Sequence, residues 1–167
     1  MNKRNIILIG MPGAGKSSVG VILAKVLGYE FIDTDLVIQH REKRLLREII
    51  ADEGNEGFLA IENEVNATLE ADKSVIAPGG SAIYGKEAME HFKEIGTIVY
   101  LKLSYEDLAK RLGNLKGRGV VLKEGQTLKD LYDERSKLYE QYAEITFDES
   151  GRDIQGTILA LREQIGM

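Results

Sequence analysis

The stretch that decides the fold covers residues 6–18 and reads IILIGMPGAGKSS. An apolar run is followed by a glycine-rich turn, then by Lys16 and Ser17, and then by residues with helical periodicity. The spacing from Gly10 to Ser17 satisfies G-x-x-x-x-G-K-[ST], which is a phosphate-binding loop when a strand precedes it and a helix follows it. The alternative is an ordinary strand–turn–helix corner with a chance Gly-Lys-Ser. Because both flanking elements fit, the sequence predicts that a phosphate group binds here.

Each residue type in this loop suits a bound nucleotide. Glycines tolerate positive φ and carry no Cβ, so the backbone N–H groups can turn toward an anion at the positive end of the following helix. A lysine at this position reaches the β- and γ-phosphates, and the following serine hydroxyl is placed to ligate Mg²⁺. The residues expected to bind the nucleotide are Gly13, Ala14, Gly15, Lys16, Ser17 and Ser18.

The composition narrows the class of protein. A chain of 167 residues without a long linker predicts one α/β domain with a sizeable core. The absence of cysteine excludes disulfides and thiolate metal sites and fits a reducing compartment, so we expect a cytoplasmic protein. A net charge of −5 without a basic block argues against a nucleic-acid surface. The apolar run before Gly10 is too short for a signal peptide, and no stretch reaches transmembrane length. We expect no membrane partner and a monomer.

Apolar runs alternate with amphipathic segments along the chain, which predicts a parallel sheet with helices on both faces, a three-layer α/β fold. We find no internal repeat or domain boundary, and Gly28 and Gly54 are expected to end helices. The expected strands are residues 5–9, 30–33, 74–77, 97–103 and 144–147. The expected helices are residues 16–27, 36–41, 45–52, 56–70, 86–94, 127–142 and 154–165, with another that Ser104 caps.

Two carboxylates, Asp33 and Asp35, follow the second expected strand. Open α/β sheets bind their ligands at the carboxyl ends of the strands. One carboxylate could therefore support a metal while the other meets a substrate hydroxyl. A solvated loop in which an Asp caps the next helix explains the same spacing.

Three further features of the sequence indicate parts of a binding site or of the core. Gly79 and Gly80 follow a strand and permit close approach of a ligand, although a plain turn has the same signature. Residues 113–119 are glycine-rich and basic, which favours a mobile lid over about 113–126, in which Arg118 could close over a phosphate or simply be exposed. Glu62 borders an apolar helical stripe, and we expect it to be half-exposed.

The phosphate-loop proteins include GTPases, ATPases and small-molecule kinases. A GTPase needs a guanine-reading Asn-Lys-x-Asp, which is absent from the sequence. The usual ATPase carries an acidic residue at the end of a later apolar strand. Here strand 97–103 ends at Leu103 and is followed by Ser104, and strand 74–77 is followed by Pro78 and Gly79. The early Asp-x-Asp, the basic lid and the short chain favour a small-molecule kinase.

The chain resembles the shikimate kinase family over nearly its whole length. The resemblance implies a five-stranded parallel sheet in the order 2-3-1-4-5, one P-loop kinase domain over residues 1–167, ATP and Mg²⁺ as cofactors, and a role in aromatic amino acid biosynthesis. It implies lid arginines at Arg111 and Arg118, an adenine contact at Arg152, and an acceptor site at Asp35, Gly79, Gly80 and Arg135. The matching stretches are residues 10–18, 31–35, 58–62, 78–81 and 134–139.

Two departures from the family pattern fall in the acceptor half. Leu59 replaces the helix arginine that contacts shikimate, and Ser81 replaces the third glycine of a loop; Gly119 also follows Arg118 where proline is usual. A guanidinium clamp on a carboxylate contributes about 1.5–3 kcal/mol for each charged hydrogen bond. Loss of one such clamp weakens recognition of shikimate more than recognition of ATP. We therefore expect the acceptor to be shikimate or a different polyol or hydroxy acid.

The expected activity is transfer of the γ-phosphoryl group of ATP to a hydroxyl of this small acceptor. Lys16, Asp35 and Arg118 are the expected catalytic residues, while Ser17 and Asp33 are the expected magnesium ligands. The competing interpretation is a nucleotide-binding regulatory protein that has lost acceptor chemistry. An ADP-release assay with several hydroxylated acids distinguishes the two.

Overall fold

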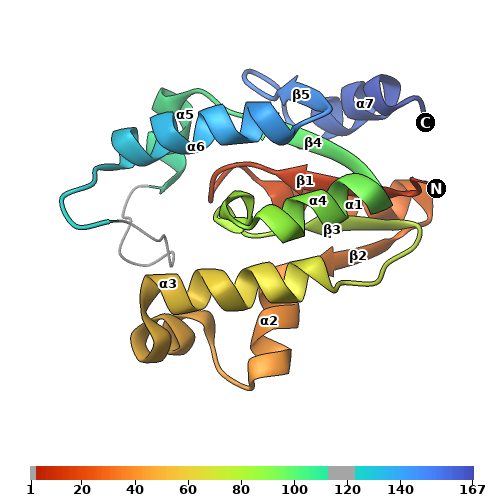
Figure 1. The fold of residues 1–167 in the computed structure, drawn as a ribbon. Coiled ribbons are helices and arrows are strands. Elements are labelled where there is room, and N and C mark those ends of the chain that lie inside the picture. The colour runs from red at the N-terminus through yellow and green to blue at the C-terminus, as the bar shows by residue number, and fades with distance from the viewer. Residues whose placement is uncertain (1–2, 113–122) are drawn as a thin grey trace.

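The structure, a computed structural model, describes residues 3–112 and 123–167. Within them, one or more helices follow each strand, from the first strand to the last helix (Figure 1). The strands are β1 Asn5–Ile9, β2 Glu30–Asp33, β3 Ser74–Ala77, β4 Gly96–Lys102 and β5 Ile145–Asp148. The helices are α1 Lys16–Leu27, α2 Thr34–Glu42, α3 Leu46–Ala67, the 3₁₀ turn η1 Ala82–Tyr84, α4 Lys86–Ile95, α5 Tyr105–Leu112, α6 Leu128–Tyr142 and α7 Ile154–Ile165.

The strands form one parallel sheet in the order β2-β3-β1-β4-β5, which confirms the expected fold class and strand order. The central strand β1 pairs with β3 on one side and β4 on the other, so that Ile7 lies opposite Ile76 and Ile98. Because all strands run the same way, their carboxyl ends meet at one edge. The segments that follow β1, β2 and β3 therefore lie close together.

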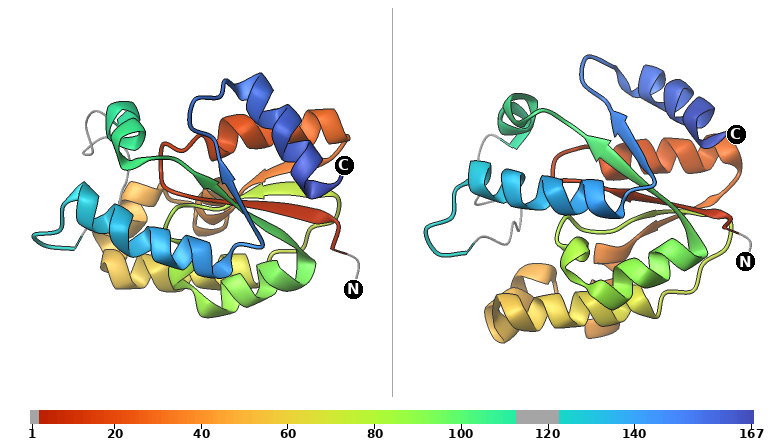
Figure 2. Two further views of the ribbon diagram at one scale, coloured as in Figure 1. Left: turned by 90° about the horizontal axis from the view of Figure 1, so that it is seen from above. Right: turned by 45° about the horizontal axis from the view of Figure 1, so that its top comes forward.

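Helices cover both faces of the sheet (Figure 2). Ile6 and Leu8 of β1 pack on one face with residues of α1 and α7. Ile7 and Ile9 point to the other face, where residues of α4, α5 and α6 cover them. All four side chains are at most 2% exposed. Burial on both faces explains why the strand reads as an unbroken apolar run rather than an alternating one.

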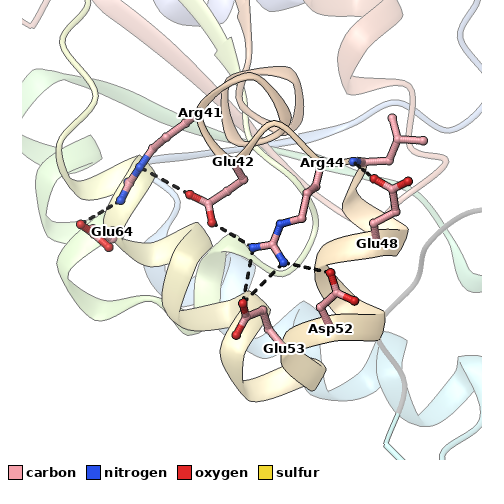
Figure 3. A network of polar contacts seen from close by, with 8 residues as sticks. Arg41, Glu42, Arg44, Glu48, Asp52, Glu53 and Glu64 are labelled. Atoms are coloured by element: carbon pink, nitrogen blue, oxygen red, sulfur yellow. Dashed lines mark hydrogen bonds and ion pairs between the residues drawn. The ribbon is translucent and has the colours of Figure 1, made fainter.

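Helices α2 and α3 lie beside the β2 edge and have their own small core. Gly54 interrupts α3 with φ 74° and ψ 177°, so the helix break expected there is confirmed. Before this break, the Arg44 guanidinium makes ion pairs with Glu42, Asp52 and Glu53, which joins the end of α2 to the first turns of α3 (Figure 3). The residues of this core are Ile38, Ile49, Phe58 and Val65.

A few boundaries differ from the expected ones. Helix α2 begins at Thr34 rather than at residue 36, because the Asp33 side chain accepts a hydrogen bond from the Asp35 N–H at 2.9 Å and caps the helix there. Strand β4 begins and ends one residue earlier than expected, and β5 one residue later. Across residues 3–112 and 123–167, no helix is both long and apolar enough to span a bilayer. Of the lid expected over residues 113–126, residues 113–122 lie outside the described chain.

Candidate active site

The loop between β1 and α1 forms the floor of the site. Gly13 and Gly15 both have φ +87°, a conformation that glycine adopts readily. A Cβ on Gly13 would lie 2.8 Å from Leu112 Cδ2, so a larger residue would also clash. Gly15 precedes the first turn of α1, and no described side chain caps that turn. The first N–H groups of α1 are therefore suited to bind an anion.

Lys16 is almost fully buried at the start of α1. Its ammonium donates hydrogen bonds to the carbonyl oxygens of Gly10, at 2.7 Å, and Met11, at 2.8 Å. Burial lowers the pKa of Lys16 to about 8, while the negative charge of Asp35 opposes that shift. The ammonium lies inside the loop, where it is within reach of a phosphate that the loop binds.

A cavity of about 530 Å³ opens above this loop, at the carboxyl ends of β1, β2 and β3. It is lined by residues from six segments that are far apart in the sequence, among them helix α3. The candidate residues around it are Gly13, Gly15, Lys16, Ser17, Ser18, Asp33, Asp35, Gly79, Gly80, Arg111 and Arg135.

Asp33 and Asp35 both face this cavity, so the two explanations of their spacing combine. Asp33 caps α2, as an ordinary N-cap residue does, and it also lies beside the phosphate-binding loop. Burial and the nearby charge of Asp33 raise the pKa of Asp35 to about 6, and Lys16 opposes this. Asp35 can therefore hold or release a proton near neutral pH.

Ser17 and Asp33 are the oxygen-bearing side chains that fit a magnesium ion. Mg²⁺ is usually held by one or two carboxylates together with substrate phosphates and water, rather than by a cage of protein ligands. The described residues contain no group of three or more His, Cys, Asp or Glu side chains arranged to hold a metal. A hydroxyl and a carboxylate that face the same phosphate-binding cavity match the donor set that Mg²⁺ needs.

The two glycines after β3 bring the backbone close to charged side chains. A Cβ on Gly79 would lie 2.9 Å from Asp35 Oδ1, and a Cβ on Gly80 would lie 2.9 Å from Arg135 Nη1. Arg135 reaches this point from α6 and is 1% exposed. The Tyr139 hydroxyl donates a hydrogen bond to the Gly80 carbonyl at 2.7 Å. The turn is therefore part of the cavity wall.

Glu62 was expected to be half-exposed, and this expectation is wrong: the residue is 1% exposed and lines the cavity. Its Oε1 accepts a hydrogen bond from the Ser81 hydroxyl at 2.6 Å. Burial raises the pKa of Glu62 to about 7, although the Ser81 hydrogen bond opposes the shift. Sequence periodicity missed Glu62 because the loop that covers it lies seventeen residues or more away along the chain; its position four residues after Phe58 was the available signal.

A second cavity of about 180 Å³ lies on the other side of the phosphate-binding loop. Arg111 stands between the two cavities, and its Nη1 donates hydrogen bonds to Glu149 Oε1 at 3.2 Å and to the Gly13 carbonyl at 3.4 Å. Glu149 is 4% exposed, and the sequence reasoning did not find it because it lies in a loop without periodicity. Arg152 also lines this cavity, with Ala14 and Ser18. Arg118 lies outside the described residues.

A phosphate-binding loop with an acidic pair and a buried arginine at the carboxyl edge of a five-stranded parallel sheet defines a P-loop small-molecule kinase. The family model "Shikimate kinase" matches residues 12–165. The chain therefore belongs to the shikimate kinase family. It is an ATP-dependent phosphotransferase with an alcohol group as acceptor.

Individual relatives agree with this assignment. Shikimate kinase 2 of Yersinia enterocolitica is 34% identical over 154 residues, which cover 87% of this chain and 86% of that protein. The solved structure of shikimate kinase from Acinetobacter baumannii in complex with shikimate has a TM-score of 0.86 and 32% identity, and the match covers 98% of this chain and 93% of that chain. The Aquifex aeolicus enzyme has a TM-score of 0.81 and 28% identity, with 97% and 96% covered.

Proposed function

We propose that this chain transfers the γ-phosphoryl group of ATP to a hydroxyl of shikimate or of a closely related hydroxy acid. The observation that carries the proposal is the single cavity in which Lys16, Asp35 and Arg135 meet. One end of this cavity suits phosphates and the other suits a hydroxylated carboxylic acid. The similarity to the Acinetobacter baumannii enzyme, whose structure contains shikimate, supports the choice of acceptor.

The donor half of the site lies at the phosphate-binding loop. The loop N–H groups and Lys16 hold the phosphates. Ser17 and Asp33 are the residues that would hold Mg²⁺, which would supply positive charge next to the phosphates. The second cavity, with Arg111 and Arg152 at its wall, takes the adenine end of ATP. We predict that Arg118 closes over the phosphates as part of a lid over residues 113–126.

The acceptor half depends on Asp35. Phosphoryl transfer passes through a loose transition state, so positioning and electrostatics contribute more than the strength of the base. Asp35 orients the acceptor hydroxyl and takes its proton as the oxygen of that hydroxyl bonds to the γ-phosphorus, while the bond from the γ-phosphorus to the bridging oxygen breaks and ADP leaves. Arg135 binds the acceptor carboxylate, and the backbone of Gly79 and Gly80 holds the acceptor against the loop. A bound acceptor excludes water from this cavity, which prevents transfer of the phosphoryl group to water instead of to the acceptor.

We also propose that the acceptor site departs from the usual pattern of the family. Leu59 is absent from the cavity wall and packs against the small core of α2 and α3. Ser81 lines the cavity and binds Glu62. If the missing arginine limits shikimate binding, Leu59→Arg will lower the KM for shikimate. An unchanged KM would mean that the acceptor is a different hydroxy acid or that the pocket differs more widely.

The test is ADP release measured against shikimate, gluconate and other hydroxylated acids. We expect ADP release that depends on the acceptor and is lost in Lys16→Ala, because the charge that stabilises the transferring group is gone. Asp35→Asn should lower turnover with little change in ATP affinity. ATP binding without turnover for any acceptor would instead favour a regulatory protein. We further propose that residues 1–167 act as one domain and as a monomer, which light scattering coupled to gel filtration tests.

A further inference from the structure

The guanidinium of Arg135 lies against the turn that follows β3. A Cβ on Gly80 would lie 2.9 Å from Arg135 Nη1, so the backbone of this turn approaches the group closely. Further along the same turn, in η1, the ring of Tyr84 lies with its centroid 5.5 Å from Arg135 Cζ, which is within the range of a cation–π contact. One short segment, residues 80–84, therefore lies close to the guanidinium at two points.

Helix α6 holds the Tyr84 ring in place. The Tyr84 hydroxyl donates a hydrogen bond to Glu134 Oε2 at 2.7 Å. Burial and this hydrogen bond raise the pKa of Tyr84, so the hydroxyl keeps its proton and remains a donor at neutral pH. The other oxygen, Glu134 Oε1, pairs with Lys123 Nζ at 3.2 Å. Glu134 directly precedes Arg135, so the residue that fixes the ring and the residue that the ring contacts are neighbours on one helix.

An aromatic ring suits this position better than a carboxylate would. Arg135 is 1% exposed, and its positive charge acts on Lys16 and Glu62 of the same cavity. A carboxylate beside the guanidinium would orient it but would also occupy N–H groups that can bind the carboxylate of an acceptor. The face of a ring attracts the cation without accepting such hydrogen bonds from the edge of the guanidinium. Tyr84 can therefore orient Arg135 without competing with a ligand for its N–H groups.

We propose that Tyr84 is a positioning residue for the reaction: its ring, fixed by Glu134, holds the Arg135 guanidinium in the orientation that binds the acceptor carboxylate. The proposal rests on the proposed function, in which Arg135 has that role. Tyr84 is not among the described residues that line the cavity, so it acts through Arg135 rather than by touching the acceptor. Without the ring, the long arginine side chain would sample more rotamers, and the acceptor would have to order it on binding.

The first experiment measures steady-state kinetics of Tyr84→Leu and Tyr84→Phe, with shikimate and ATP varied in turn. Leucine removes the ring, so the KM for shikimate should rise about 3- to 30-fold, while the KM for ATP stays unchanged and kcat falls less than about 3-fold. Phenylalanine keeps the ring and loses only the hydroxyl, so its KM for shikimate should lie closer to that of wild type. Equal increases in the KM for shikimate and for ATP, or equal KM values for the two variants, would show that the ring does not position Arg135.

Tyr105→Leu is the matched control for these kinetics. The Tyr105 ring of α5 also has a cation near its face, with Lys129 Nζ 5.2 Å from the centroid, and the residue lines neither of the two cavities. Its loss should leave the KM for shikimate and the KM for ATP as in wild type. An increase in the KM for shikimate as large as that in Tyr84→Leu would mean that general loosening of the fold, rather than the contact with Arg135, causes the effect.

A measurement that needs no activity separates this proposal from the proposed function. In protein labelled with nitrogen-15, the Nε–H signal of Arg135, assigned by its loss in Arg135→Lys, reports the nearby ring. Tyr84→Leu should shift this signal, because an aromatic ring changes the magnetic field near its face, whereas Tyr84→Phe should leave it close to that of wild type. An unchanged signal in Tyr84→Leu would overturn the proposal. If wild type shows no turnover with shikimate, the proposed function fails, and this comparison still decides whether Tyr84 holds Arg135.

Discussion

Replacing Glu62 with glutamine should stabilise the fold at alkaline pH. A carboxylate that faces a substrate cavity at 1% exposure is unfavourable for folding, because burial penalises its charged form. Glutamine has nearly the same shape, keeps an oxygen that can accept from Ser81, and carries no charge. The substitution therefore removes the electrostatic cost of the buried carboxylate while leaving the packing in place.

The magnitude follows from the pKa of Glu62, which burial raises from 4.5 to about 7. Between these values the folded protein holds a proton that the unfolded chain has released, so the free energy of unfolding falls as the pH rises. Above pH 7 the whole cost is present. At about 1.4 kcal/mol for each pH unit, it amounts to about 3 kcal/mol. Because little of it is present at pH 5, the advantage of the variant should grow by about 2–3 kcal/mol between pH 5 and pH 8.

The assay is urea denaturation of wild type and Glu62→Gln at pH 5 and pH 8, followed by circular dichroism. Glu64→Gln is the matched control, since this exposed residue of α3 pairs with Arg41 and should shift the free energy of unfolding by less than about 0.5 kcal/mol at either pH. A variant that is no more stable than wild type at pH 8 would refute the reasoning. So would a gain of equal size at both pH values, because it would come from packing rather than from charge.

Three other variants test separate contacts. Glu149→Gln should raise the KM for ATP several-fold and leave the KM for the acceptor unchanged, because Arg111 loses its charged partner at 3.2 Å. Steady-state kinetics with each substrate varied in turn measures both KM values, and equal changes in the two would contradict this prediction. Tyr139→Phe should lower the free energy of unfolding by about 1–3 kcal/mol, because the buried carbonyl of Gly80 loses its donor, and thermal denaturation that matches wild type would count against this. Thr127→Ala removes the cap of α6 and should cost about 1 kcal/mol of stability in the same measurement; altered KM values for either substrate would show that the cap has another role.

Local signals were sufficient for most of the fold. The apolar run of residues 5–9, buried on both faces, has the sequence of a central parallel strand, and the structure has that strand in the middle of the sheet. Gly54 ended a helix as expected, because its backbone lies in a region that glycine favours. The strand order came from the resemblance to a family, since residue periodicity does not say which strands are neighbours.

Local signals in the sequence also predicted part of the candidate site. The phosphate-binding loop, Asp33 and Asp35 follow strands directly, and a parallel sheet brings such positions to one edge. Glu62 and Glu149 were missed because their burial depends on segments distant in the sequence. For Glu62 the covering segment is the loop that ends at Ser81, and the spacing of four residues from Phe58 in α3 places Glu62 beside the apolar stripe without showing that this loop covers it.

The central claim is that Lys16 and Asp35 act in one cavity to move a phosphoryl group from ATP to a hydroxyl of shikimate. The most direct test is phosphorus NMR of a mixture of the enzyme, MgATP and shikimate, with Lys16→Ala as the matched control. We predict a new phosphomonoester signal that grows with ADP in wild type and is absent in the variant. ADP formed together with free inorganic phosphate, at the same rate with and without shikimate, would contradict the account.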